Sequence, residues 1–131
     1  MVTILVSGAS GIVGYGILRS LQMLDTPHRL ISTSIYDDSV APSFSDIFEI
    51  APRTDSPSYF KWLMRIIEKH NVNILIPGIE SDVFAWNQKR DEFERSNVKV
   101  VLNNSELIEL SRDKWYFYEK LLKYLDITPR K

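Results

Sequence analysis

The chain alternates short, continuously apolar runs with longer segments in which apolar residues recur every three or four positions. A continuous run of β-forming residues is typical of a strand buried on both faces of a parallel sheet. Recurrence at helical spacing predicts a helix with one apolar face. The pattern predicts strands at residues 2–6, 30–36, 46–50, 73–76 and 98–102. It predicts helices at residues 11–24, 56–71, 81–96, 105–110 and 113–126.

Two of the predicted helices carry further signals. The first has an inner face predicted at Val13, Ile17, Leu21 and Leu24. The second begins at Ser56-Pro57, with serine as the N-cap and proline in the first turn, and Asn71 is its predicted stop. Its predicted inner stripe is Phe60, Leu63, Met64 and Ile67.

Alternating strands and helices predict an α/β fold, a Rossmann-like three-layer α/β/α sandwich with a mostly parallel sheet of about five strands. The length of 131 residues suits one domain. In such folds a ligand sits beyond the carboxyl ends of the strands, where the strand order switches. Those ends carry a glycine turn at Gly8, the pair Asp37-Asp38, and residues 77–82.

The glycine turn joins the first strand to the first helix. Gly8, Gly11 and Gly14 follow a G-x-x-G-x-x-G spacing, which differs from the dinucleotide fingerprint G-x-G-x-x-G. Glycine allows a sharp bend, and bare amides at a helix start can bind an anion. We expect a larger residue at Gly11 to crowd the turn. A phosphate site and a tight turn without a ligand both remain open.

Carboxylates follow two of the predicted strands. Asp37 and Asp38 could hold ribose hydroxyls, or could be solvated loop residues. Glu80 and Asp82 could hold an amine, or could help to orient a magnesium-bound group. Asp82 could instead lie in the first turn of a helix and offset its dipole, which is the interpretation we favour for it. Glu80 is therefore the better functional candidate.

Composition narrows the function classes. The chain has no cysteine and two distant histidines, His28 and His70, so disulfides, thiolate chemistry and a histidine metal site are not expected. The net charge of −1 without a basic cluster argues against nucleic acid. No apolar run approaches the ~20 residues that span a bilayer, and no signal peptide is evident. We expect a cytoplasmic protein with no membrane partner.

The last predicted helix is densely aromatic. Tyr116 and Lys120 reproduce the Tyr-x-x-x-Lys spacing of short-chain dehydrogenases, a pattern that any aromatic helix with lysines produces by chance. The apolar surface of this helix is wider than one stripe of ~100° and predicts two contacts. One is the sheet, and the other is a further domain or a partner chain, which leaves a homodimer open.

Four segments in order resemble one family, the N-terminal pre-ATP-grasp domain of ATP-grasp ligases, especially the carbamoyl-phosphate-synthase-like members. They are residues 4–11 with 17–21, residues 45–46 leading to 51–52, residues 74–82, and residues 111–122 ending in 127–129. The last segment, SRDKWYFYEKLL followed by ITP, is the most specific. It is similar to the passage that leads these proteins into their ATP-binding domain.

This resemblance implies that residues 1–126 form the pre-ATP-grasp domain and that residues 127–131 begin a linker to an ATP-grasp domain outside the chain. That domain would bind ATP and Mg²⁺ and carry the catalytic residues, so the chain alone has neither cofactor nor catalytic group. The implied partners are this domain and a small-molecule acceptor substrate. The residues implied in the acceptor pocket are Gly8, Ser10, Gly11 and Glu80. The whole protein would activate a carboxylate with ATP for attack by an amine or ammonia.

Two other hypotheses remain. The glycine turn also suits an NAD(P)-binding protein of the short-chain dehydrogenase type. Against it, residues 77–80 read Pro-Gly-Ile-Glu where those enzymes place an Asn-Ala-Gly-like run, and residues 111–129 find no counterpart there. A regulatory or interaction module that has kept the fold without chemistry is the third hypothesis.

Overall fold

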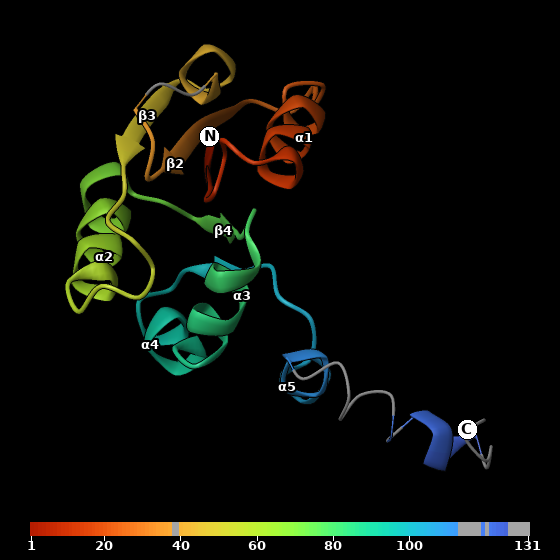
Figure 1. Cartoon of the computed structure of the whole chain (residues 1–131). Helices are drawn as coiled ribbons and strands as arrows, with labels where there is room; N and C mark the ends of the chain where they lie inside the picture. Colours follow the sequence, from red (N-terminus) through yellow and green to blue (C-terminus); the bar gives the residue numbers. More distant parts are fainter. Residues whose placement is uncertain (38–39, 113–118, 120, 126–131) are drawn as a thin grey trace.

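The computed structural model of the chain describes residues 1–37, 40–112, 119 and 121–125. Its centre is a five-stranded, all-parallel sheet in the order β3-β2-β1-β4-β5 (Figure 1). The strands are β1 (Val2–Val6), β2 (His28–Ser34), β3 (Ile47–Ile50), β4 (Ile74–Ile76) and β5 (Lys99–Val100). The predicted α/β class and parallel sheet are confirmed.

Helices cover both faces of the sheet. They are α1 (Ile12–Leu21), α2 (Tyr59–His70), α3 (Glu80–Asn87), α4 (Arg90–Arg95) and α5 (Ser105–Arg112), together with the short 3₁₀ helix η1 (Ala41–Phe44). Side chains alternate along β1, so that Ile4 and Val6 pack in one core with Leu18 of α1, while Leu5 packs in the other. The second core is completed by α2, α3 and α4, which gives the predicted three layers (Figure 1).

The order of the strands reverses at β1. From β1 the chain moves outward through β2 to β3, and then returns across the sheet through α2 to β4 on the other side of β1. The helix that follows β1 covers one face of the sheet, and the helices that follow β4 cover the other face. This divergence opens a crevice at the carboxyl ends of these two strands. The turn after β1 and the segment between β4 and α3 meet at this point.

The boundaries of several elements differ from the predictions. Strand β2 begins and ends two residues earlier than expected, and β5 has two residues instead of five. The single helix predicted over residues 81–96 is two helices, α3 and α4, separated at Gln88–Lys89. The predicted helix over residues 113–126 falls mostly outside the described residues.

The inner face predicted for α1 is confirmed at Ile17 and Leu21, which pack against the core, and wrong at its other two positions. Val13 and Leu24 are exposed, and the buried positions of α1 are Gly14 and Leu18. The helix lies so close to the turn after β1 that only glycine fits at the contact, and an apolar periodicity does not register a residue without a side chain. The helix also ends at Leu21, three residues before the predicted end.

Helix α2 matches its prediction better at its end than at its start. Asn71 stops it in the left-handed conformation, with φ 53° and ψ 50°. The helix begins at Tyr59, after a turn in which the Ser56 hydroxyl accepts a bond from the Ser58 amide, so Ser56 is not its N-cap. Its buried residues include Leu63 and Ile67 as predicted, with Tyr59 and Ile66 added. Phe60 and Met64 are partly buried against the same core.

No helix in the described part of the chain is both long enough and apolar enough to cross a membrane.

Candidate functional site

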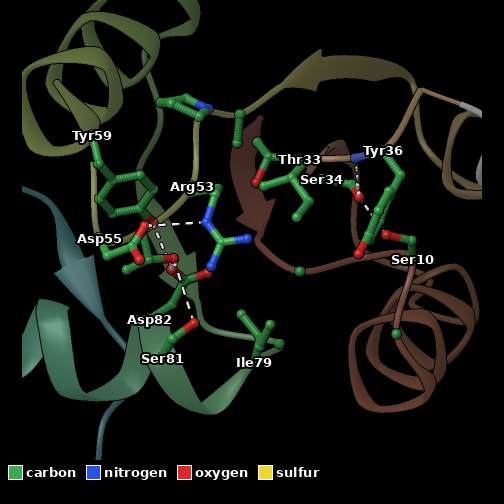
Figure 2. A pocket seen from close by; sticks show the side chains of 17 residues that line it. Ser10, Thr33, Ser34, Tyr36, Arg53, Asp55, Tyr59, Ile79, Ser81 and Asp82 are labelled. Atoms are coloured by element: carbon green, nitrogen blue, oxygen red, sulfur yellow. Dashed lines mark hydrogen bonds and ion pairs between the residues drawn. The ribbon is translucent and has the colours of Figure 1, made fainter. Parts of the chain in front are cut away.

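A cavity of about 410 Å³ opens in the crevice at the carboxyl ends of the strands. Four segments form it: the turn after β1, the end of β2, the loop after β3 with the first residue of α2, and the start of α3. Figure 2 shows two polar walls. The first wall carries Ser10, Ser34 and Tyr36, and the second wall, opposite it, carries Tyr59, Ser81 and Asp82. Arg53 lies between the two walls. The position agrees with the ligand crevice predicted from the alternation of elements.

Glycines allow the first wall to close tightly. Gly8 has a φ of +56°, and a Cβ there would stand 2.6 Å from Cγ2 of Ile79. A Cβ on Gly14 would stand 2.4 Å from the Gly8 oxygen, and one on Gly78 would stand 2.2 Å from the Ser7 oxygen. The turn after β1, the N-terminal part of α1 and the loop after β4 therefore touch through backbone atoms.

Gly11 does not share this constraint. A Cβ at Gly11 would lie 3.5 Å from the Gly8 oxygen, which is an ordinary contact, and its φ of −84° suits any residue. The expectation that a side chain at Gly11 crowds the turn is therefore wrong for its Cβ atom. Gly11 is the N-cap of α1 and lines the cavity, so the positive end of the helix dipole faces the ligand space.

Hydroxyl groups join the glycine turn to strand β2. The side chains of Ser10 and Ser34 are hydrogen-bonded to each other, and the Tyr36 amide donates to Ser34 Oγ at 3.1 Å. The Ala9 amide donates to the Thr33 carbonyl at 3.0 Å. These bonds fix the wall that carries the predicted residue Ser10, and they orient its hydroxyl along the cavity.

The opposite wall contains a buried carboxylate. Asp82 is only 4% exposed, and among the described residues it is the only charged side chain that is buried. Its Oδ1 accepts hydrogen bonds from Thr54 Oγ1 at 2.7 Å and from the Tyr59 hydroxyl at 2.9 Å. The Tyr59 hydroxyl in turn accepts a bond from Trp86 Nε1 at 2.9 Å. A chain of hydrogen bonds thus connects the cavity to the core between α2 and α3.

The Tyr59 hydroxyl keeps its proton in this network. Burial, together with the neighbouring negative charge of Asp82, raises the pKa of the Tyr59 phenol far above its usual range. The hydroxyl is therefore fixed as a donor to Asp82, which orients the carboxylate. Asp82 also lies in the first turn of α3, as favoured from the sequence, where a negative charge offsets the helix dipole.

The mouth of the cavity carries an exposed ion pair. Arg53 Nε lies 3.3 Å from Asp55 Oδ1, and both side chains are about three-quarters exposed, at 74% and 76%. An exposed pair of this kind contributes little to stability. Its charges balance each other at the entrance, so the net charge inside the cavity comes from Asp82.

The structure brings three of the four predicted pocket residues together. Gly8, Ser10 and Gly11 line the cavity. Glu80 is exposed and is not among the lining residues, because it is the first residue of α3 and Asp82, two positions later, faces the cavity instead. The pocket position predicted for Glu80 is therefore corrected.

The residues considered for a dinucleotide are not assembled here. Asp37 is exposed and does not line the cavity. Asp38, Tyr116 and Lys120 lie outside the described residues, as does the segment at 127–129 that carried part of the resemblance.

The sequence analysis did not identify several residues that line the cavity. Thr54 and Tyr59 were not considered, although the rule that ligands sit beyond strand ends points to the loop after the third strand as much as to the other two. Tyr59 was hidden because the predicted helix began at Ser56, which placed Tyr59 outside the inner stripe. Ser34 and Tyr36 could have been found from the same rule at the end of the second strand.

The described residues offer no group of three or more acidic or histidine side chains that could hold a metal ion. The N-terminus of α1 beside Ser10 has chemistry that suits an anionic group, through backbone amides and the helix dipole.

Solved structures share this fold. N5-carboxyaminoimidazole synthetase from Staphylococcus aureus, complexed with ADP, matches 93% of the chain at 16% identity with a TM-score of 0.68. The biotin carboxylase domain of a single-chain bacterial carboxylase matches 97% at 15% identity with a TM-score of 0.70. The chain spans only 30% and 29% of these two proteins. These two structures share the predicted Rossmann-like α/β fold.

A dehydratase solved with NAD is also similar, at a lower TM-score. dTDP-glucose 4,6-dehydratase from Bacillus anthracis, in complex with NAD, matches 76% of the chain and 36% of its own length at 16% identity, with a TM-score of 0.58. The TM-scores of these structures establish a shared Rossmann-like fold.

Sequence comparison gives the family. No curated protein sequence matches the chain. The family model for the PylC-like N-terminal domain matches residues 19–101, which is more than half of the chain and includes the end of β2, the loop after β3 and the start of α3. The chain therefore belongs to the PylC-like N-terminal domain family.

Proposed function

We propose that this chain is the N-terminal, substrate-side domain of an ATP-grasp ligase that joins a carboxylate to an amine or ammonia. The observation that carries the proposal is the cavity at the reversal point of the sheet, in a domain of the PylC-like N-terminal family. Two solved proteins of the same fold are named as a synthetase and a carboxylase, and one of them was solved with ADP.

In this proposal residues 1–126 form one wall of an active site and residues 127–131 begin a linker to an ATP-grasp domain. ATP and Mg²⁺ would bind in that second domain, where ATP supplies the phosphoryl group that activates the carboxylate. The residues described here bind and orient the acceptor and exclude water from it. Gly8, Ser10 and Gly11 form the first wall. The absence of cysteine is consistent with a cytoplasmic protein.

The chain alone is not catalytic in this proposal, which gives a direct test. The protein encoded by the whole reading frame should release ADP from ATP when a suitable carboxylate and amine are both present, and this chain should release none. A reading frame without a glycine-rich ATP-grasp domain after residue 131 would refute the proposal.

The alternative function, NAD(P) binding, is tested with the chain itself. A ligand at 100 times its dissociation constant adds ~2.7 kcal/mol to stability. For a domain of this size that corresponds to a rise in melting temperature on the order of 10 °C. We expect no such rise with sub-millimolar NAD, NADP or ATP. A clear rise with NAD or NADP would favour the dehydrogenase hypothesis over the ligase.

A further inference from the structure

We propose that the cavity recognises a primary ammonium group of its ligand, and that the carboxylate of Asp82 is the group that binds it. The inference rests on the function proposed above, since it names the chemical group that the acceptor presents to this domain. It assigns the role to Asp82, two residues beyond the position expected from the sequence.

The first argument is the unused oxygen of Asp82. Both hydrogen bonds to this side chain, from Thr54 and Tyr59, go to Oδ1. Within the described part of the chain, Oδ2 receives no hydrogen bond. No side-chain nitrogen or oxygen of the described residues is both sealed from solvent and unpaired. Oδ2 must therefore reach solvent, and the space next to Asp82 is the cavity.

The second argument is the hydrogen-bonding character of the surrounding wall. The hydroxyl protons of Thr54 and Tyr59 are already directed to Asp82, so these two hydroxyls have no further proton to donate into the cavity. Ser81 Oγ lies 3.4 Å from Thr54 Oγ1 and adds a further acceptor. An ammonium group has three donors and no acceptor, which fits this set.

The third argument is the local charge. Asp82 is a buried acidic side chain, and the N-terminus of α3 beside it offsets only part of the charge of a carboxylate. Arg53 does not neutralise the rest, because it is paired with Asp55 and is 74% exposed at the mouth. The cavity wall that carries Asp82 therefore keeps a net negative electrostatic potential, which a bound cation would neutralise. Burial strengthens this attraction relative to the same pair in water.

The test is a titration of the ¹⁵N-labelled chain followed by NMR. The probe is n-butylammonium chloride, and the matched probes are 1-butanol, which has the same shape without the charge, and potassium chloride at equal ionic strength. We expect saturable shifts of the Trp86 indole N–H and of the Ser81 and Asp82 amides with n-butylammonium only. Trp86 reports because its indole donates to the tyrosine that holds Asp82.

Three variants sharpen the result. Asp82→Asn should weaken n-butylammonium binding by about tenfold or more, the effect expected for loss of a charged hydrogen-bond partner. Asp91→Asn, an exposed acid in the first turn of α4, should bind as the unmodified chain does. Glu80→Gln should also retain binding. Loss of binding in Glu80→Gln with retention in Asp82→Asn would overturn the assignment.

The titration of the unmodified chain tests the proposal even if Asp82→Asn fails to fold. Equal shifts with 1-butanol, or saturable shifts confined to residues away from the cavity, would overturn the proposal. So would the absence of any saturable response to n-butylammonium. Failure of this site is distinguishable from failure of the proposed ligase function, because ADP release by the whole protein depends on the ATP-grasp domain and is measured separately.

Discussion

The contact between Gly78 and the turn after β1 gives the sharpest prediction about stability. A Cβ at this position would stand 2.2 Å from the Ser7 oxygen and 2.7 Å from the Gly14 Cα. Both neighbours are backbone atoms of packed elements, so neither can rotate away as the end of a side chain could. The φ of Gly78 lies outside the left-handed region, and Gly78→Ala therefore tests the contact alone.

The expected cost follows from that geometry. Overpacking a tight core costs about 1–3 kcal/mol, and a clash with backbone on two sides belongs at the upper end of this range. Alanine also restricts the conformations of the unfolded chain, which offsets up to ~1 kcal/mol of this cost. The net loss in the free energy of unfolding is about 2–3 kcal/mol. At roughly 4 °C per kcal/mol for a domain of this size, the melting temperature should fall by about 8–12 °C.

The assay is thermal unfolding followed by circular dichroism, with Gly16→Ala as the matched control. Gly16 lies in α1 with nothing within 4 Å of its added Cβ, so the same chemical change should raise stability by about 0.5–1 kcal/mol. Gly11→Ala should change it little, since its Cβ meets an ordinary contact at 3.5 Å. A Gly78→Ala protein as stable as the unmodified chain would refute the close-contact reasoning.

Two further predictions concern polar groups. Tyr59→Phe removes the acceptor of the buried Trp86 indole N–H and should lower the free energy of unfolding by about 1–3 kcal/mol in urea denaturation; a loss below the error of that measurement would contradict the network. Partial burial alone would raise the pKa of Glu49, but hydrogen bonds from Lys69 and His70 hold it below its ordinary value of 4.5. Its stabilising contribution is therefore present above about pH 4.5 and lost as the pH falls through the folded-state pKa. Glu49→Gln should cost about 0.5–1 kcal/mol at pH 7, with a difference from the unmodified chain that shrinks on acidification; a difference that does not change with pH would contradict it.

The strands and the end of α2 could be predicted because their signals are local. A continuous apolar run defines β1, and Asn71 stops a helix because asparagine tolerates the left-handed conformation. The contact of α1 could not be predicted in the same way. It depends on the close approach of Gly14 to Gly8, and the absence of a side chain leaves no trace in a hydrophobic pattern.

The cavity was predictable in place but not in composition. The alternation of strands and helices located it at the carboxyl ends of the strands, and Gly8, Ser10 and Gly11 line it. The choice between Glu80 and Asp82 depended on where α3 begins, which a sequence pattern defines only to within a few residues. Because α3 begins at Glu80, Asp82 faces the cavity and Glu80 is exposed to solvent.

The backbone contacts of Gly8, Gly14 and Gly78 also limit how this domain can diversify. A wall built from bare main chain cannot acquire new side chains without losing its closure. Changes in ligand preference are therefore expected at cavity positions that carry side chains, such as those in the loop after β3 and the first turn of α3. Libraries that aim to alter selectivity should vary positions such as Thr54 and Ser81 and leave the three glycines intact.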